Sequence, residues 1–444
     1  MRIAHFTDAF LPEVSGVATS IATHTTALAS RGHEVLIMCP RYREQALFAV
    51  PGIQVRRYAS FSFVSNKATR VALPSLASAV RTLRRFEPDV VHIHTPLGVG
   101  VAGVMAARWL GVPNVQTYHT YIPDFMQYVE PYRLLRLDSL QERIVNSLIF
   151  ERMFESDVWQ RLAYAGRLSE DAVRTIDETA AEVLAEVGQA GKPELSTRLA
   201  WQFTRTLYNR ANLVLTPSEI LKDELERNGI TRPVEYLSNG IDMTLIEPKT
   251  GYTQTGRILH AGRLGHEKNI DVVVRAFAHL AEGHPLATLD IIGEGPARAG
   301  LERLIAGLPV RDRIRMLGAM DRDQLAKTYR EYDLFATAST IETQGIVLLE
   351  AMTAGLPVVA VDALAAPELV RDGRDGFIVA PGDEKAMAER IGRMLDDEVL
   401  WRAMGAAARQ DMMPHELESV VSRLESLYSR VMAEGVETAL GVEA

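Results

Sequence analysis

Short hydrophobic runs alternate with longer segments of helical period along the first part of the chain. Each run is too short for a helix and is followed by a loop and a helical segment, which predicts buried strands. The runs lie at residues 3–7, 35–39, 90–94, 115–118 and 213–216. A helix over residues 16–30 stops at Gly32, and the helix after Pro96 stops at Gly111, where glycine supplies a left-handed cap. Strands separated by helices predict a parallel sheet with helices on both faces.

The same alternation restarts after Asn239-Gly240-Ile241-Asp242. A second set of hydrophobic runs lies at residues 257–261, 289–293, 315–318, 334–338, 358–361 and 377–379. This repeat predicts an α/β fold with two Rossmann-like, doubly wound domains. Ligands of such sheets bind beyond the carboxyl ends of the strands, so we expect the two domains to face a central cleft.

The alternation stops between about residues 125 and 201, a stretch with charges of both signs and a helical composition. The plain interpretation is a helical insertion in the first domain, and the alternative is a lid or an element that shapes the acceptor site. We predict an N-terminal domain over residues 1–235 and a C-terminal domain over residues 236–414. A final helix within residues 415–444 is expected to pack back on the first domain.

The length of 444 residues agrees with two domains, because a single hydrophobic core stops growing at roughly 250–300 residues. The only cysteine, Cys39, cannot form an internal disulfide, which fits a reducing compartment and predicts a cytoplasmic protein. Asp8 interrupts the first hydrophobic stretch, so we expect no secretory signal. We expect no membrane-spanning helix, which needs ~18 consecutive, predominantly apolar residues.

Charge is distributed unevenly along the chain. The net charge of −9 argues against general nucleic-acid binding. Residues 1–124 nevertheless carry 12 Lys and Arg against 7 Asp and Glu. A helix expected over residues 74–86 holds Arg81, Arg84 and Arg85. Such a helix either rests on anionic lipid headgroups or is an ordinary solvated helix.

Two candidate sites follow strands of the first domain. The loop over residues 8–17 opens the first helix, and its Gly16 would let a ligand approach free backbone N–H groups; a strand–helix turn without a ligand is the alternative. His119 directly follows the strand over residues 115–118, which places it at the ligand edge; a structural histidine is the alternative. His92 and His94 share one strand face, a spacing compatible with metal ligation, but no carboxylate or cysteine partner is evident from the sequence, so we expect no metal site.

The loop after the strand over residues 257–261 carries two cations. Arg263 and Lys268 lie five residues apart on a glycine-containing loop, a pattern that suits a diphosphate because Arg offers a fork and Lys a point charge. The glycine spacing is not that of a Walker loop. Gly293-Glu294-Gly295-Pro296 follows the next strand as a tight turn that leaves room for a nucleoside.

The strongest motif is a pair of carboxylates, Glu342 and Glu350, eight residues apart across a loop–helix junction. If the helix begins near Gly345, its N–H groups and positive end point at an anion. Carboxylates at these two places suit sugar hydroxyls, which donate hydrogen bonds. The D-x-D sequence at Asp321 and Asp323 is interpreted instead as a helix start, with Gln324 completing a capping box.

Together these residues resemble the retaining glycosyltransferases of the GT-B fold, the group-one family that uses nucleotide-diphosphate sugars. The E-x7-E pair is the most specific motif of this resemblance, supported by the Arg263–Lys268 loop. The resemblance implies that Arg263 and Lys268 hold the diphosphate, that Glu350 binds the ribose hydroxyls and that Glu342 contacts the donor sugar.

The resemblance also implies the roles of the smaller groups. The backbone N–H groups around Gln344, Gly345 and Ile346 would meet the sugar and phosphates, and Gly293 and Glu294 would lie at the nucleoside. Gly16 would sit under the diphosphate. His119 would lie beside the anomeric carbon and contact the donor sugar. No protein nucleophile, cofactor or metal ion is expected, because family members generally use cationic side chains to stabilise the leaving group.

Within this family the chain is similar to bacterial diacylglycerol glucosyltransferases, on residues 6–8, 12–20, 117–120 and 342–345. This implies a hexosyltransferase that moves glucose from UDP-glucose to a membrane lipid such as 1,2-diacylglycerol, with the protein peripheral on the inner face of the cell membrane. The first alternative keeps the chemistry but uses a soluble sugar, inositol or phosphoinositide-type acceptor. The second is a catalytically silent protein that binds sugar nucleotides at the membrane surface. No nucleic-acid partner is expected.

Overall fold

The computed structural model describes residues 1–13, 15–42, 48–62, 70–72, 74–122, 192–249 and 255–439. The chain divides into two compact units. The first comprises Met1–Thr216, Lys222–Tyr236 and Leu424–Ala444, and the second comprises Pro217–Leu221 and Leu237–Arg423. Most of the predicted insertion, about residues 125–201, lies outside the described residues.

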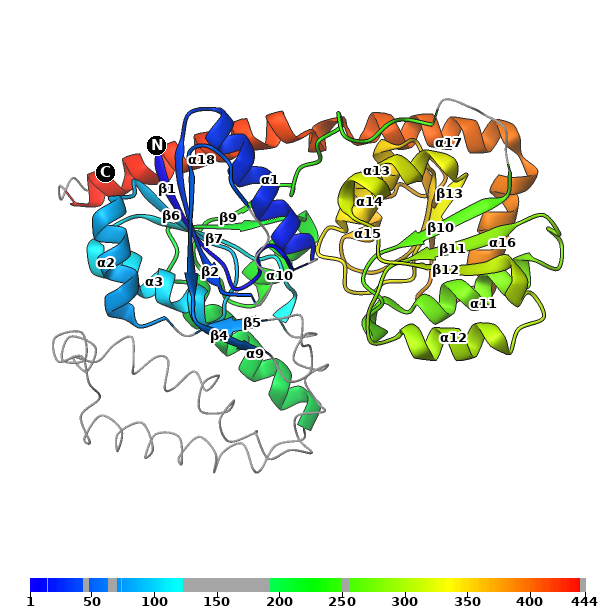
Figure 1. Ribbon diagram of the computed structural model, residues 1–444, viewed down its shortest axis with the longest axis horizontal. Helices are drawn as coiled ribbons and strands as arrows, with labels where there is room; N and C mark the ends of the chain where they lie inside the picture. The colour runs from blue at the N-terminus through cyan, green and yellow to red at the C-terminus, as the bar shows by residue number, and fades with distance from the viewer. Residues whose placement is uncertain are drawn as a thin grey trace. The chain divides into compact units, whose positions relative to one another are not determined.

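The first unit contains a parallel sheet with the strand order β3-β2-β1-β6-β7-β8-β9 (Figure 1). Its strands are β1 (Arg2–Phe6), β2 (Glu34–Pro40), β3 (Ile53–Tyr58), β6 (Val90–Ile93), β7 (Asn114–Thr117), β8 (Leu213–Thr216) and β9 (Val234–Tyr236). A separate antiparallel pair joins β4 (Ser60–Ser62) and β5 (Arg70–Ala72). The five strands predicted for this half are therefore confirmed, while β3, β9 and the short pair were not predicted.

Helices connect these strands, and their ends follow local sequence signals. Those between strands are α1 (Gly16–Ser30), α2 (Leu76–Phe86), α3 (Gly98–Leu110), α9 (Lys192–Tyr208) and α10 (Glu219–Arg227). The last helix, α18 (Leu417–Ala439), connects no strands, and it belongs to this unit from Leu424 onward. Ser15 caps α1 by accepting a hydrogen bond from the backbone N–H of Ala18 at 3.2 Å. Gly111 ends α3 with φ of 67°, the left-handed cap that the sequence predicts.

The second unit contains a parallel sheet with the order β12-β11-β10-β13-β14-β15. Its strands are β10 (Arg257–Ala261), β11 (Thr288–Ile292), β12 (Ile314–Gly318), β13 (Leu334–Ala336), β14 (Val358–Val361) and β15 (Gly376–Val379). Its α-helices are α11 (Ile270–Leu280), α12 (Arg298–Ala306), α13 (Arg322–Thr328), α14 (Ile346–Thr353), α15 (Ala366–Leu369), α16 (Glu384–Asp396) and α17 (Glu398–Asp411). All six strands predicted for this half are present.

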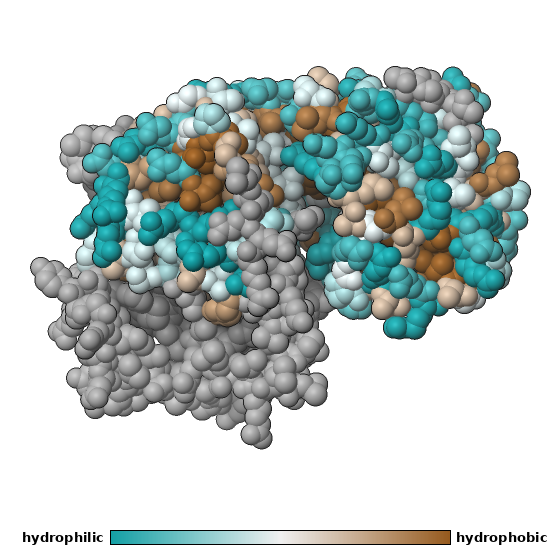
Figure 2. Space-filling model, viewed as in Figure 1, coloured by the Kyte–Doolittle hydropathy of each residue, from teal (hydrophilic) through white to brown (hydrophobic). Residues whose placement is uncertain are grey.

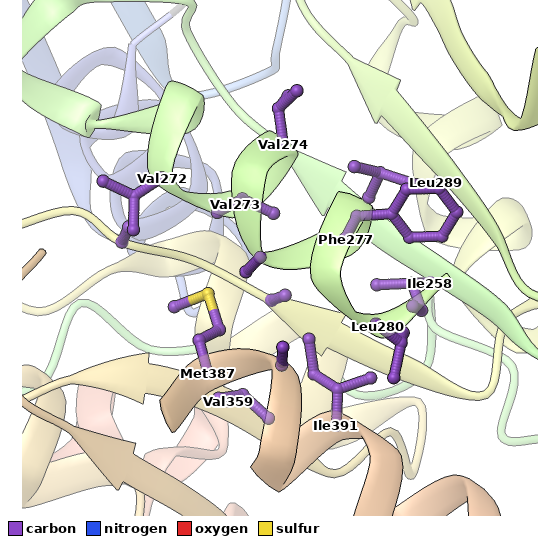
Figure 3. Packing of buried hydrophobic residues seen from close by; sticks show 14 of the residues in the cluster. Ile258, Val272, Val273, Val274, Phe277, Leu280, Leu289, Val359, Met387 and Ile391 are labelled. Carbon is purple, nitrogen blue, oxygen red and sulfur yellow. The ribbon is translucent and has the colours of Figure 1, made fainter. Parts of the chain in front are cut away.

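Hydrophobic clusters cover both faces of this second sheet. One cluster joins Ile258 and Val359 to residues of α11 and α16, such as Phe277 and Ile391 (Figure 3). The neighbouring strand residues Leu259 and Val358 belong to the other cluster, with α14. Because successive strand residues point to opposite faces, burial on both sides explains the uninterrupted hydrophobic runs in the sequence. Each such buried aliphatic side chain contributes about 1.5–3 kcal/mol.

Both sheets have the doubly wound order of a Rossmann fold, in which the direction of winding reverses beside the first strand. The reversal lies between β1 and β6 in the first unit and between β10 and β13 in the second. Ligands of such sheets bind outside the carboxyl ends of the strands at this point. The predicted fold class is therefore confirmed. Among the described residues, no helix has the length and apolar character required to cross a membrane.

Candidate active site

Two charged groups meet at the carboxyl edge of the second sheet. Lys268 ends the short 3-10 helix η2 (His266–Lys268) that follows β10, and Glu342 lies on the loop after β13. The Lys268 Nζ atom donates a hydrogen bond to Glu342 Oε1 at 2.5 Å, and both side chains are largely buried. The structure therefore brings together two predicted site residues that are 74 positions apart, at the point where the sheet reverses its winding.

Glu342 stays ionised in this position. Burial acts to raise the pKa of Glu342, but the charge of Lys268 and its hydrogen bond outweigh burial, so the pKa is lowered from its usual value. The edge of the sheet thus holds a carboxylate and an ammonium group side by side. The first accepts hydrogen bonds from hydroxyls, and the second binds anions.

Arg263 lies on the same loop as Lys268 but has a different partner. Its guanidinium forms an ion pair with the carboxylate of Glu267, which is buried four residues further along. A phosphate that binds Arg263 would share the guanidinium with this carboxylate. The structure therefore shows Lys268, rather than Arg263, in direct contact with Glu342.

The glycines of the Gly293-Glu294-Gly295-Pro296 turn are required for packing between loops. A Cβ on Gly293 would lie 1.9 Å from the carbonyl oxygen of Gly262, and φ of Gly293 is 148°. A Cβ on Gly295 would lie 2.5 Å from the carbonyl oxygen of Leu264. Because these glycines have no side chain, the backbones of the loops after β10 and β11 can pack directly against each other. Glu294 is exposed and forms an ion pair with Arg298 one turn along the chain.

The helix that follows Glu342 begins as the sequence predicts. Gly345 precedes α14 with φ of 85°, in the left-handed region, and Ile346 is the first helical residue. The side chain of Gln344 is only 1% exposed and is engaged in the protein. Its Oε1 accepts a hydrogen bond from the backbone N–H of Asn239 at 2.8 Å, and its Nε2 donates to Ser238 Oγ at 2.9 Å. Gln344 therefore anchors the start of α14 to the 238–240 loop, a structural role that its sequence position did not indicate.

Glu350, the second carboxylate of the motif, lies inside α14. The residue is 6% exposed, and its Oε2 accepts a hydrogen bond from the Tyr329 hydroxyl at 2.8 Å. Burial raises the pKa of Glu350, and the Tyr329 hydrogen bond opposes this only in part. The two carboxylates of the motif thus have different environments, because Glu342 has an ammonium partner and Glu350 a neutral hydroxyl.

His119 follows β7 at the carboxyl edge of the first sheet. It is 8% exposed, and its Nε2 is hydrogen-bonded to Nδ1 of His94 at 3.0 Å. Burial lowers the pKa of His119 to about 3, so the ring is neutral at pH 7. Gly16 is the exposed first residue of α1, directly after its Ser15 cap.

Sequence reasoning missed His5 and did not indicate the structural role of Asp8. His5 of β1 pairs in register with His92 of β6, which places it beside the two histidines that the sequence identified. Asp8 follows β1 and caps α3, accepting hydrogen bonds from Val99 N at 2.8 Å and from Gly100 N at 3.3 Å. Burial raises the pKa of Asp8 to about 6.

The histidines are the one group in the described residues with the spacing of metal ligands. His5, His92 and His94 each offer a nitrogen atom within 4.8 Å of the others. Both nitrogens of His92 are engaged, however, with Tyr428 Oη at 2.6 Å and Thr117 Oγ1 at 2.7 Å. A metal ion held by all three rings would have to displace these hydrogen bonds.

The D-x-D sequence forms the predicted helix start. Asp321 Oδ1 accepts from the backbone N–H of Gln324 at 2.8 Å, and Gln324 Oε1 accepts from the backbone N–H of Asp321 at 3.4 Å. These bonds make a capping box at the beginning of α13. The capping interpretation is therefore confirmed.

Comparison with known protein families accounts for both units. Residues 14–153 and 161–245 match the model described as glycosyltransferase family 4, which is more than half of the chain. Residues 244–411 match the model described as glycosyl transferases group 1. The chain belongs to these glycosyltransferases. Its fold is GT-B, and it is a hexosyltransferase related to diacylglycerol glucosyltransferases.

Individual relatives of this glycosyltransferase differ in their substrates. An alpha-monoglucosyldiacylglycerol synthase of Streptococcus pneumoniae is 28% identical over 81% of this chain and 71% of its own length. A GDP-mannose-dependent alpha-mannosyltransferase of Mycobacterium tuberculosis is 26% identical over 97% of both chains. Among solved structures, an Anabaena protein in complex with UDP-glucose has a TM-score of 0.67 at 19% identity, over 97% of this chain and 100% of its own.

Proposed function

We propose that this glycosyltransferase transfers glucose from UDP-glucose to 1,2-diacylglycerol with retention of the anomeric configuration. The observation that carries the acceptor is the likeness to the pneumococcal synthase, whose name states a glucosyl-diacylglycerol product and which aligns over 81% of this chain. The Anabaena protein of similar fold binds UDP-glucose. The Lys268–Glu342 pair supplies the charges that such a donor requires.

The donor would be held by the second unit. Lys268 and Arg263 bind the diphosphate, and the backbone N–H groups at Gly345 and Ile346 add the positive end of α14. Glu342, ionised beside Lys268, accepts a hydrogen bond from a hydroxyl of the sugar. Glu350 accepts from the ribose hydroxyls.

Departure of the leaving group is the demanding part of the reaction. The bond between the anomeric carbon and the phosphate oxygen breaks, and negative charge grows on the diphosphate. Lys268 and the N-terminus of α14 stabilise this charge most when it is largest, which lowers the barrier. The acceptor oxygen forms the new bond on the same face of the sugar, and its proton passes to the departing phosphate oxygen, so no protein nucleophile is required. His119 and Gly16 of the first unit complete the proposed set, with His119 contacting the donor sugar.

A donor and acceptor panel tests this assignment on the purified full chain. UDP-glucose, UDP-galactose and GDP-mannose are each supplied with diacylglycerol vesicles, with inositol, or with no acceptor, and nucleotide release is measured. The expected result is release that requires both UDP-glucose and diacylglycerol. Turnover of GDP-mannose, or of UDP-glucose with inositol alone, would contradict the lipid glucosyltransferase.

The runner-up function keeps the chemistry and changes the acceptor to a soluble sugar or inositol derivative. The observation in its favour is the GDP-mannose-dependent relative, which aligns over 97% of both chains, more evenly than the pneumococcal synthase. A catalytically silent sugar-nucleotide-binding protein is the third possibility, and the intact Lys268–Glu342 pair argues against it. The same panel separates the three, because a silent protein binds a donor without releasing nucleotide.

A lipid acceptor requires a surface that meets the membrane, and α2 with α3 offers one. Arg81, Arg84 and Arg85 are exposed on α2, and the surface over this helix is mostly hydrophilic (Figure 2). Trp109, near the end of the neighbouring α3, is 41% exposed. The hydrophobic residues of α2 face the core, as Leu83 shows. The proposed contact is therefore electrostatic with one aromatic anchor, rather than insertion of an apolar helix face.

Replacing the three arginines of α2 by glutamine is expected to lower binding to phosphatidylglycerol vesicles about a hundredfold, because each surface cation contributes about 1 kcal/mol. Vesicle flotation of parent and variant measures this. A matched variant changes three exposed arginines of the second unit to glutamine, namely Arg311, Arg330 and Arg402. If the two variants lose binding equally, the charge of the whole protein and not this surface attracts the membrane.

A further inference from the structure

Three neutral imidazole rings form a hydrogen-bonded row inside the first unit. His5 Nδ1 lies 2.8 Å from His94 Nε2, and His94 Nδ1 lies 3.0 Å from His119 Nε2. His5 lies in β1, His94 directly follows β6, and His119 lies two residues after the end of β7. The His94 ring is nearly parallel to both of its partners, at 13° and 22°. The row therefore begins in the core and ends at the proposed donor-sugar residue.

The row has only two possible arrangements of protons. Each neutral ring carries one N–H group and one nitrogen lone pair, so each link needs a donor on one side and an acceptor on the other. In one arrangement His5 donates to His94, His94 donates to His119, and the N–H of His119 is on Nδ1. In the other, His119 donates from Nε2, every link is reversed, and the N–H of His5 is on Nε2.

The buried end of the row distinguishes these arrangements. His5 is fully buried, and its Nε2 has no hydrogen-bond partner among the described residues. In the second arrangement this atom would be a buried N–H donor without an acceptor, the rarest kind of unsatisfied polar group in folded proteins. In the first arrangement it is only a lone pair. The first arrangement is therefore favoured.

We propose that His94 is a positioning residue that holds His119 as its Nδ1–H tautomer, with His5 setting the direction of the row. This inference deepens the proposed function, since it takes the donor-sugar role of His119 from it. His119 then presents an N–H donor and does not accept a proton through Nδ1. Its ligand is an oxygen of the donor sugar or of the diphosphate. Because both nitrogens of His94 are engaged, the ring orientation and the tautomer of His119 are fixed together.

Nitrogen NMR on 15N-histidine-labelled full-length protein tests the tautomer without any substrate. The His119 signals are assigned by their loss in His119→Gln, and couplings to the ring protons identify which nitrogen carries the proton. The expected result is a proton on Nδ1 in the parent. A proton on Nε2 in the parent overturns the proposal outright, whether or not any variant folds.

Variants then test whether His94 sets this state. In His94→Phe the tautomer of His119 is expected to become mixed, and kcat is expected to fall about tenfold, the effect of one hydrogen bond, with a smaller change in KM. Tyr428→Phe is the matched control, because it removes a partner of His92 only and should leave the His119 signals unchanged. An unchanged His119 tautomer in folded His94→Phe would show that the row does not position it.

Two further results separate this inference from its alternatives. A stoichiometric divalent metal in the purified parent that is lost in His94→Phe would make the ring a metal ligand and overturn the hydrogen-bonded row. A correct tautomer in a protein that turns over no donor would leave the row intact and refute the proposed function instead. A failure of the tautomer prediction can therefore be distinguished from a failure of the proposed function in the donor panel.

Discussion

Replacing Lys268 by methionine is expected to lower kcat for nucleotide release by about 10²–10³, the usual effect of removing one preorganised group that stabilises transition-state charge. Methionine keeps most of the length of the side chain and removes its terminal charge and its N–H donors. The loss should appear mainly in kcat, because the charge on the diphosphate is largest when the sugar–phosphate bond breaks. Steady-state kinetics at saturating donor measure it.

The ion pair complicates this result and also provides its control. Without Lys268, the carboxylate of Glu342 remains largely buried without its 2.5 Å partner, which costs stability as well as activity. A double-mutant cycle with Glu342→Gln separates the two effects. If Glu342 contacts the sugar directly, the double variant should be less active than either single variant. If Glu342 acts only by holding Lys268, the double variant should be no worse than Lys268→Met.

Thermal melts of all three variants show whether the losses are local. A Lys268→Met protein that melts like the parent and retains its kcat would refute the role of Lys268 at the diphosphate. If Lys268→Met is both inactive and unfolded, the ion pair is a structural element. The kcat of the double variant, which has no unpaired charge, then shows whether Lys268 also has a role in catalysis.

The sequence predicted the central strands well because they are buried on both faces. In β10 and β14 every residue after the first is buried, so the hydrophobic run coincides with the strand. The strand β3 was missed because it lies at the edge of its sheet, where Gln54 and Arg56 alternate with more buried residues. Such a pattern does not differ from that of a solvated loop with scattered hydrophobic residues. Strand β9, with three residues, is too short for any periodicity.

Contacts between distant residues set the limit of prediction at the site. The motif at Glu342 marked the start of α14, because Gly345 is a local signal. Nothing local indicated that Glu342 contacts Lys268, since this depends on β10 and β13 being neighbours in the sheet. The same holds for His5, whose position beside His92 follows only from the register of β1 with β6. In a Rossmann fold the first strand lies between the second strand and the strand that follows the crossover, as β1 lies beside β6 and β10 beside β13. If this order is assumed in advance, the sequence predicts that both pairs of residues lie on neighbouring strands.

The first unit is expected to lose stability steeply between pH 6.5 and 4.5. His5, His92, His94 and His119 are buried, and burial lowers the pKa of each, to about 3 for His5 and His119. In the unfolded chain their pKa is about 6.5. Below that pH the unfolded state binds protons that the folded state excludes, so stability is complete above pH 6.5 and is lost as the pH falls.

The expected pH dependence of the free energy of unfolding follows from the number of protons that the unfolded chain binds and the folded state does not. Each histidine contributes up to about 1.4 kcal/mol per pH unit once the unfolded chain is protonated. Asp8 has the opposite sign, because burial raises its pKa to about 6 and the folded state takes up a proton there first. The net difference of about three protons gives a slope of about 4 kcal/mol per pH unit. A typical domain stability of about 5–15 kcal/mol is then exhausted within a few pH units.

Denaturant unfolding at pH 7.5, 6.5, 5.5 and 5.0 measures this slope, and amide hydrogen exchange of β1 and β6 assigns it to the first unit. His94→Phe removes one of the four histidines, so the slope should fall by about 1.4 kcal/mol per pH unit. This holds whatever the substitution does to the free energy of unfolding at pH 7.5. His279→Gln, which changes an exposed histidine of α11 in the second unit, is the matched substitution and should leave the hydrogen exchange of β1 and β6 unchanged. Equal free energies of unfolding at pH 7.5 and pH 5.0 would mean that the four rings are not held neutral. The row of imidazoles that ends at His119 would then need a different assignment of its protons.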